Sequence, residues 1–118
     1  MPKGSSSFVR VSYPKLSKDD VVKLLSTRLK GLSEKLSLHK VVLFGSYATG
    51  RFTASSDIDL LIVYEGERRG DAYNLAVEAL MLPRLEPHCY SKAEYEALIK
   101  SSKGFVKMLK AGIQVYPL

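Results

Sequence analysis

The chain has 118 residues, of which 46% are hydrophobic, and its formal net charge is +6. This length supports one domain with a single core and excludes a separate domain for a second substrate. No apolar run approaches the roughly 20 residues that span a membrane, and the first residues lack the apolar core of a signal peptide. The single cysteine excludes an internal disulfide framework. We therefore expect a cytoplasmic protein with no membrane association.

The N-terminal part predicts a tail followed by a helix. Residues 1–16 are expected to form a flexible tail or arm, in which residues 8–13 alternate well enough for an added strand. Residues 17–118 are expected to form the domain. Ser17 followed by Asp20 is typical of a capping box and predicts a helix over about residues 18–36. The apolar face of this helix comprises Val21, Val22, Leu24, Leu25, Leu29, Leu32 and Leu36.

A short apolar run, Val41 to Phe44, predicts a buried strand that ends at Gly45 and Ser46. A glycine at this point lets the backbone come close to a bulky anion. Ser46 offers a hydroxyl and its own N–H to phosphate oxygens, at the start of a short helical turn. We therefore predict a phosphate-binding turn at Gly45 and Ser46.

Residues 57–63 predict a second apolar strand that begins with two carboxylates. Since side chains alternate along a strand, Asp57 and Asp59 point to the same side, roughly 6 to 7 Å apart at their Cα atoms. Ionised carboxylates near a core are costly unless a cation compensates them. Oxygen ligands suit Mg²⁺ or Mn²⁺, and Mg²⁺ is usually held by one or two carboxylates plus substrate phosphates. The alternative is that the acids cap loop N–H groups or pair with Arg51 or Arg84.

The spacing of Gly45 and Gly50 also resembles the opening of a P-loop. That motif requires a lysine and then a serine or threonine at the next two positions. Arg51 and Phe52 stand there instead, so the sequence excludes a P-loop.

The rest of the chain predicts a continued alternation of helices and strands. A helix over residues 71–82, a strand over 83–90 and helices over 92–101 and 103–111 are expected. Pro83 should stop the first of these helices, and Ser91 with Glu94 should cap the second. Gly112 is the expected C-terminal cap of the last. The predicted order is therefore αβαβαβα.

Two stretches, Leu43 to Gly50 and Ser56 to Val63, resemble the minimal nucleotidyltransferases, the small branch of the DNA polymerase beta-like superfamily. The resemblance extends over roughly residues 18–117, including the closing residues 112–116. It implies an α/β (α+β) fold: one small domain with a mixed β-sheet of three to five strands backed by helices. It also implies a nucleoside triphosphate, with ATP expected, and two divalent metal ions, Mg²⁺ or Mn²⁺. The expected nucleotide-binding residues are Gly45, Ser46, Arg51 and Ser56.

The resemblance implies that Asp57, Asp59 and a third carboxylate on a later strand hold the metal ions, and the third carboxylate of the family is usually Asp. Glu86 is the only acid in the third predicted strand, so we assign it the role of third metal ligand and general base. Glu86 is one methylene longer than Asp, and Pro87 restricts its strand to a sheet edge or a bulge. The alternative is a solvated edge acid that faces Arg84.

Positive charge is concentrated near the C-terminus and in the loops. Four lysines are spaced three, four and three residues apart: Lys100, Lys103, Lys107 and Lys110. Gly104 is expected to break this stripe, which we interpret as a solvated face, with RNA binding left open. Arg68 and Arg69, with Arg84, are expected to flank the proposed site and to meet triphosphate or an acidic partner.

His88 and Cys89 follow Glu86 in the same predicted strand. By alternation His88 falls on the same side as Glu86, where we expect a hydrogen-bonded structural residue rather than a ligand. Cys89 is expected to pack as a small hydrophobic residue.

The resemblance implies transfer of a nucleoside monophosphate to a hydroxyl acceptor, with in-line attack on the α-phosphate and departure of pyrophosphate. Since the chain has no room for an acceptor-binding domain, the acceptor must come with a partner or with a homo-oligomer. The family is commonly paired with small helical HEPN-domain RNases as toxin and antitoxin, and RNA or a small molecule is a further possible acceptor. The alternative is a non-catalytic module that binds and neutralises a partner protein, if Glu86 and Pro87 fail to complete the metal site.

Overall fold

A computed structural model describes residues 16–53 and 55–117. The elements in chain order are α1 (Lys18–Lys35), β2 (Leu38–Phe44), α2 (Ser46–Thr49), β3 (Ile58–Tyr64), α3 (Ala72–Leu80), β4 (Leu85–Ser91), α4 (Lys92–Ser101), α5 (Lys103–Lys110) and β5 (Ile113–Tyr116). The strand expected over residues 8–13 lies outside the described residues. Leu16, placed at the end of the expected tail, packs against the core. In the part of the chain that the structure describes, no helix has both the length and the apolar character that crossing a membrane requires.

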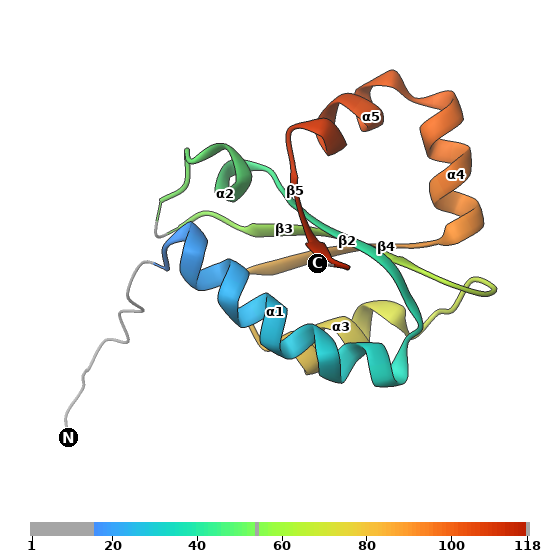
Figure 1. Cartoon of the computed structure of the whole chain (residues 1–118), viewed down its shortest axis with the longest axis horizontal. Helices are drawn as coiled ribbons and strands as arrows, with labels where there is room; N and C mark the ends of the chain where they lie inside the picture. Colours follow the sequence, from blue (N-terminus) through green and yellow to red (C-terminus); the bar gives the residue numbers. More distant parts are fainter. Residues whose placement is uncertain (1–15, 54, 118) are drawn as a thin grey trace.

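The strands form one mixed sheet in the order β4-β3-β2-β5. β2 is antiparallel to β3 and β5, whereas β3 and β4 are parallel. Figure 1 shows α1 and α3 on one face of the sheet and α4 and α5 over the other. The predicted fold class is therefore confirmed. Pro87 lies in β4, which is an edge strand, as its missing N–H donor predicts.

The main core lies between the sheet and helices α1 and α3. The capping box predicted for α1 is present: the Ser17 hydroxyl accepts the Asp20 N–H, and the Asp20 carboxylate accepts the Ser17 N–H, both at 3.0 Å. Five residues of the predicted apolar face are fully buried: Val21, Leu25, Leu29, Leu32 and Leu36. Each buried leucine contributes about 1.5 to 3 kcal/mol relative to an exposed one.

A second, smaller cluster lies on the other face of the sheet, beneath α4 and α5. Its buried members are Val42, Leu61, Val63 and Tyr95, and Phe44, Tyr90, Phe105 and Leu109 pack against them. The alternation of β3 divides its side chains between the two clusters, because Ile58, Leu60 and Ile62 face the main core. Asp59 therefore lies on the α4 and α5 side of the sheet.

Helix α3 ends two residues earlier than the position of Pro83 predicts. Met81 adopts a left-handed conformation with φ of 48° and terminates the helix after Leu80. The guanidinium of Arg28 on α1 donates to the carbonyl oxygens of Leu80 and Met81 at 2.8 and 3.1 Å. This long-range contact satisfies carbonyls that the helix end leaves unpaired.

The prediction that Gly112 caps α5 is wrong, because the cap is Ala111. Gly112 is instead needed for the close approach of β5 to β2. A Cβ at Gly112 would lie 2.6 Å from Cγ1 of Val42 and 2.9 Å from the carbonyl oxygen of Leu43. β5 itself is missing from the predicted order of elements, because a run of four residues gives little periodicity.

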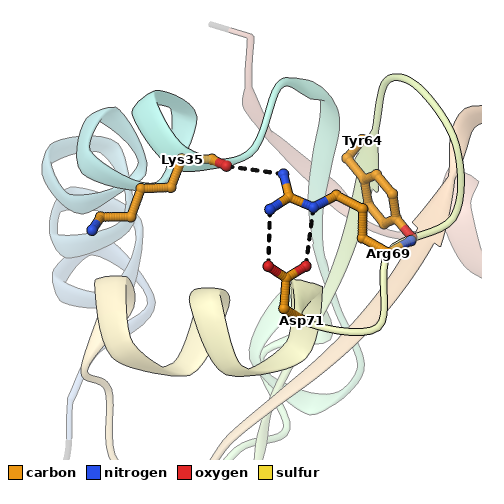
Figure 2. A network of polar contacts seen from close by, with 4 residues as sticks. All are labelled: Lys35, Tyr64, Arg69 and Asp71. Atoms are coloured by element: carbon orange, nitrogen blue, oxygen red, sulfur yellow. Dashed lines mark hydrogen bonds and ion pairs between the residues drawn. The ribbon is translucent and has the colours of Figure 1, made fainter.

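Arg69 joins the end of β3 to helices α1 and α3 (Figure 2). Its Nε and Nη2 atoms donate to the two carboxylate oxygens of Asp71 at 3.0 and 2.9 Å, and Nη1 donates to the Lys35 carbonyl at 3.1 Å. The Arg69 N–H donates to the Tyr64 hydroxyl at 2.9 Å. The hydrogen bonds from Arg69 hold the pKa of Asp71 below its ordinary value. The Arg69 side chain thus fixes the β3–α3 connection and is engaged within the fold.

Cys89 packs partly buried against the main core, as predicted, and burial raises the pKa of its thiol to about 11. The thiol therefore stays protonated near neutral pH. We expect alkylation by iodoacetamide at pH 8 to be about 100-fold slower in the folded protein than after unfolding, because only the thiolate reacts. Mass spectrometry of timed samples measures both rates, and equal rates would show that Cys89 is neither buried nor shifted in pKa.

Candidate functional site

β2 turns into α2 at Gly45, whose φ of 75° and ψ of −151° form a conformation that is essentially restricted to glycine. A Cβ at this position would overlap with the carboxylate of Asp59. The Gly45 carbonyl accepts the N–H groups of Ala48 and Thr49 at 3.1 and 3.2 Å. Since no side chain caps α2, the N–H groups of its first two residues, Ser46 and Tyr47, have no intrahelical partner. Glycine is therefore required here by both conformation and space, and the turn lies directly against Asp59.

The loop after the turn is held by local contacts. Tyr47 is buried and stacks on Phe52, with ring centroids 4.3 Å apart and planes inclined by 9°. The Arg51 N–H donates to the Ser46 carbonyl at 3.0 Å, whereas the Arg51 side chain is exposed. The Ser56 hydroxyl accepts the Thr53 N–H at 2.8 Å and so shapes the loop that leads to Asp57.

The two aspartates lie where β3 begins. Asp57 immediately precedes the strand, one residue outside the predicted limit, and Asp59 is its second residue. Asp59 is in register with Phe44 on β2 and with Glu86 on β4. Residues in register share a face, so Asp59 and Glu86 stand side by side on the α4 and α5 side. The Asp59 side chain is 29% exposed and the Asp57 side chain 51%.

Each aspartate has a basic neighbour. Oδ1 of Asp57 lies 3.3 Å from Nη2 of Arg84, and Oδ1 of Asp59 lies 3.7 Å from Nε2 of His88. Arg84 has a left-handed backbone, with φ of 58°, and its carbonyl accepts the Ile58 N–H at 2.8 Å. Both pairs are partly exposed, so water screens them and each contributes little to stability. The pairing of Asp57 with Arg84 is one alternative that the sequence left open.

Glu86 is exposed on the edge strand and neighbours Asp59 in register. Residues 16–53 and 55–117 contain no group of three or more histidine, cysteine or acidic side chains that could hold a metal ion as they stand. The oxygen donors of Asp57, Asp59 and Glu86 nevertheless match the chemistry that Mg²⁺ and Mn²⁺ prefer. The assignment of Glu86 as the third ligand stays a prediction, and it requires the Glu86 side chain to turn toward Asp59.

His88 is the residue near the acids that sequence reasoning undervalued. Alternation placed it on the same side as Glu86, and its register partner Leu61 confirms this. The approach of its ring to Asp59 depends on a diagonal contact between neighbouring strands. A histidine two positions after the candidate third acid is the only signal that the sequence gives for this contact.

Arg68 and Arg69 do not flank the acids, so that expectation is wrong. Nε of Arg68 pairs with Oε2 of Glu94 at 3.5 Å, and Arg69 is held by Asp71. Both arginines follow β3, whereas Asp57 precedes it. Seven strand residues separate these ends by about 23 Å.

The four lysines of the predicted stripe are exposed and border one hollow of about 420 Å³ at the corner between α4 and α5. The run is interrupted at Ser102, which caps both helices, rather than at Gly104. Within the described ranges none of the four lysines makes an ion pair with an acidic side chain. Their exposure agrees with the interpretation of a solvated face.

The sequence profile of the family described as "Nucleotidyltransferase domain" matches residues 25–109. The match covers most of the chain and includes the turn, the two aspartates and Glu86. The chain therefore belongs to the nucleotidyltransferase domain family.

Two solved structures are similar to this chain. The chain is similar to a presumed nucleotidyltransferase from Sulfolobus solfataricus, with a TM-score of 0.56 and 20% identity over 82% of this chain and 80% of that one. It is also similar to a structure described as the toxin-antitoxin MntA-HpeT mutant, with a TM-score of 0.47 and 18% identity over 86% of this chain and 73% of that one. No curated protein matches the chain significantly.

Proposed function

We propose that this protein transfers a nucleoside monophosphate from a nucleoside triphosphate to a hydroxyl acceptor, with the help of a divalent metal ion. The observation that carries the proposal is the close approach of the Gly45 backbone to the Asp59 carboxylate, with which an added Cβ would overlap. This close approach makes the phosphate-binding turn and the acidic pair one continuous surface, which a metal-bound triphosphate needs.

Gly45 and Ser46 hold the β- and γ-phosphates, and the exposed guanidinium of Arg51 adds positive charge. Ser56 supports the site by shaping the loop before Asp57. Asp57, Asp59 and Glu86 would hold the metal ions, which supply charge neutralisation for the phosphates and for the transition state.

In the reaction, the acceptor hydroxyl attacks the α-phosphorus in line. The bond from the α-phosphorus to the bridging oxygen breaks, and pyrophosphate leaves with the electron pair. Glu86 takes the proton of the hydroxyl as general base. Its place beside Asp59, on an exposed edge strand, supports this role because an acceptor can approach from solvent.

The finer proposal is that ATP is the donor and that the acceptor is a HEPN-domain partner in a toxin–antitoxin pair. Its support is the sequence resemblance carried by Leu43 to Gly50 and Ser56 to Val63. RNA and a second copy of the chain are the other acceptors to test.

A non-catalytic partner-binding module is the second candidate. It is favoured by the ion pair that Arg84 makes with Asp57, and by the absence of a ready three-acid cluster among the described residues. In that case the acids would serve the partner interface.

Replacement of Glu86 distinguishes the two candidates. We expect Glu86→Gln to reduce transfer of labelled AMP by at least about 100-fold, because the third carboxylate acts mainly in the transition state. Affinity for Mg-ATP should change by only a few-fold. Glu86→Asp should retain activity if the site merely tolerates the extra methylene of the wild-type glutamate. The assay uses α-labelled ATP with the protein encoded by the neighbouring gene or with total RNA.

Glu78→Gln is the matched control, since Glu78 is an exposed acid on α3, on the opposite side of the sheet. Wild-type protein that binds the partner tightly but transfers nothing, together with no effect of Glu86→Gln, would favour the binding module.

A further inference from the structure

A small hollow lies on the sheet face beneath α5, on the same face as Asp59. Its volume is about 160 Å³, and it is lined by Phe44, Leu61, His88, Tyr90, Phe105 and Met108. The lining side chains come from three strands and one helix. Sites for drug-sized ligands occupy about 300 to 1,000 Å³. A hollow of this size therefore accommodates one ring system rather than a whole nucleotide.

The hollow adjoins the candidate site through two residues. Phe44 immediately precedes the Gly45 turn and is in register with Asp59. The His88 ring lies 5.3 Å from the Phe44 ring, and Nε2 of His88 lies 3.7 Å from Oδ1 of Asp59. A ligand held by both the turn and the hollow therefore passes directly over the acids.

The walls of the hollow suit a flat aromatic group. Phe105 is held edge-on by Tyr90 and Tyr95, with ring centroids 6.2 and 6.1 Å apart and planes inclined by 84° and 69°. These contacts fix the Phe105 ring before a ligand arrives. The Tyr90 hydroxyl and the His88 imidazole are polar groups able to hydrogen-bond to ring nitrogens or exocyclic groups.

We propose that this hollow binds the nucleobase of the triphosphate whose phosphates lie at the Gly45 turn. The inference rests on the proposed function and adds to it the place of the base. Aromatic walls stack on any nucleobase, because every base has a π-face. The adjacent turn and acids take the charged end of the same molecule.

Binding of Mg-ATP and of Mg-tripolyphosphate, measured by calorimetry, tests the proposal because tripolyphosphate has no base. Met108→Phe fills the hollow from α5 and Phe105→Ala removes one wall. Each should weaken ATP binding by about 10-fold or more, since a lost base stack costs this much. Tripolyphosphate binding should stay within two-fold. Val106→Phe is the matched control, because Val106 is also on α5 but lines the other hollow, which the four lysines of α4 and α5 border.

Thermal melting establishes that each variant is folded. If Phe105→Ala does not fold, the binding data for Met108→Phe alone decide the test. An equal loss of affinity for ATP and for tripolyphosphate would overturn the placement of the base. Unchanged affinity of Met108→Phe for ATP would overturn it as well. Wild-type protein that binds tripolyphosphate as tightly as ATP would also overturn it, while leaving the phosphate turn intact. Failure of wild-type protein to bind either ligand with metal present would instead refute the proposed function.

Discussion

Asp59→Asn is expected to weaken metal-dependent binding of ATP by at least about 100-fold, since it removes a charged ligand from the centre of the site. Asp57→Asn should have a similar effect. Neither change should unfold the protein, because both side chains are partly exposed and a carboxylate beside another acid is not a stabilising feature. Calorimetric titration of ATP with Mg²⁺, with Mn²⁺ and with EDTA measures the metal-dependent part.

Asp19→Asn is the matched control for these variants. Asp19 is an exposed aspartate in the first turn of α1, so the same chemical change occurs away from the site. Metal-dependent affinity that persists in both Asp57→Asn and Asp59→Asn would refute the assignment of the acidic pair.

The second large effect is expected at Gly45. Gly45→Ala should lower the free energy of unfolding by about 1 to 3 kcal/mol, because alanine is strained in this glycine-restricted conformation. The added Cβ also overlaps with the Asp59 carboxylate and must displace it. Metal-dependent ATP binding should therefore fall together with stability.

Gly50→Ala separates the two causes. Gly50 also has a positive φ, of 81°, but its ψ of 8° places it in the left-handed helical region, and a Cβ there would meet no atom within 4 Å among those described. Both variants should lose stability from backbone strain, Gly50→Ala less than Gly45→Ala because αL is open to residues other than glycine. Only Gly45→Ala should lose ATP binding. Urea unfolding followed by calorimetry measures both quantities. Equal ATP affinity in the two variants would show that the close approach of Gly45 to Asp59 does not matter for binding.

Much of the fold was predictable because local signals agree with it. Both capping boxes, at Ser17 and at Ser91, form as their sequences predict and begin α1 and α4. The apolar runs became the two central strands, because both faces of the sheet are covered. Pro87 indicated an edge strand, since a central strand would need its missing N–H donor.

The parts that the sequence did not predict depend on contacts between distant segments. The end of α3, at a left-handed Met81, is supported by hydrogen bonds from Arg28, more than fifty residues away in the chain. The role of Arg69 depends on the close approach of α1 and α3, which no local pattern shows. β5 is short, so its pairing with β2 could not be read from periodicity.

The candidate site also combines features that local sequence signals predict with features that depend on contacts between distant segments. The turn and the two aspartates follow from spacing along adjacent strands, so the sequence could bring them together. The ion pair of Arg84 with Asp57 depends on a left-handed residue just before β4, and the approach of His88 to Asp59 depends on strand register. The hollow beneath α5 needs side chains from four elements and gave no sequence signal.

The most direct test of the account is an NMR titration of the protein with Mn-ATP, since Mn²⁺ broadens the signals of nearby nuclei. We predict selective loss of the backbone amide signals of Gly45, Ser46, Asp57, Asp59 and Glu86. Signals from α1 and from the four lysines of the stripe on α4 and α5 should remain sharp. Broadening centred on those lysines, or no selective broadening at the turn and the acids, would contradict the proposed metal and nucleotide site.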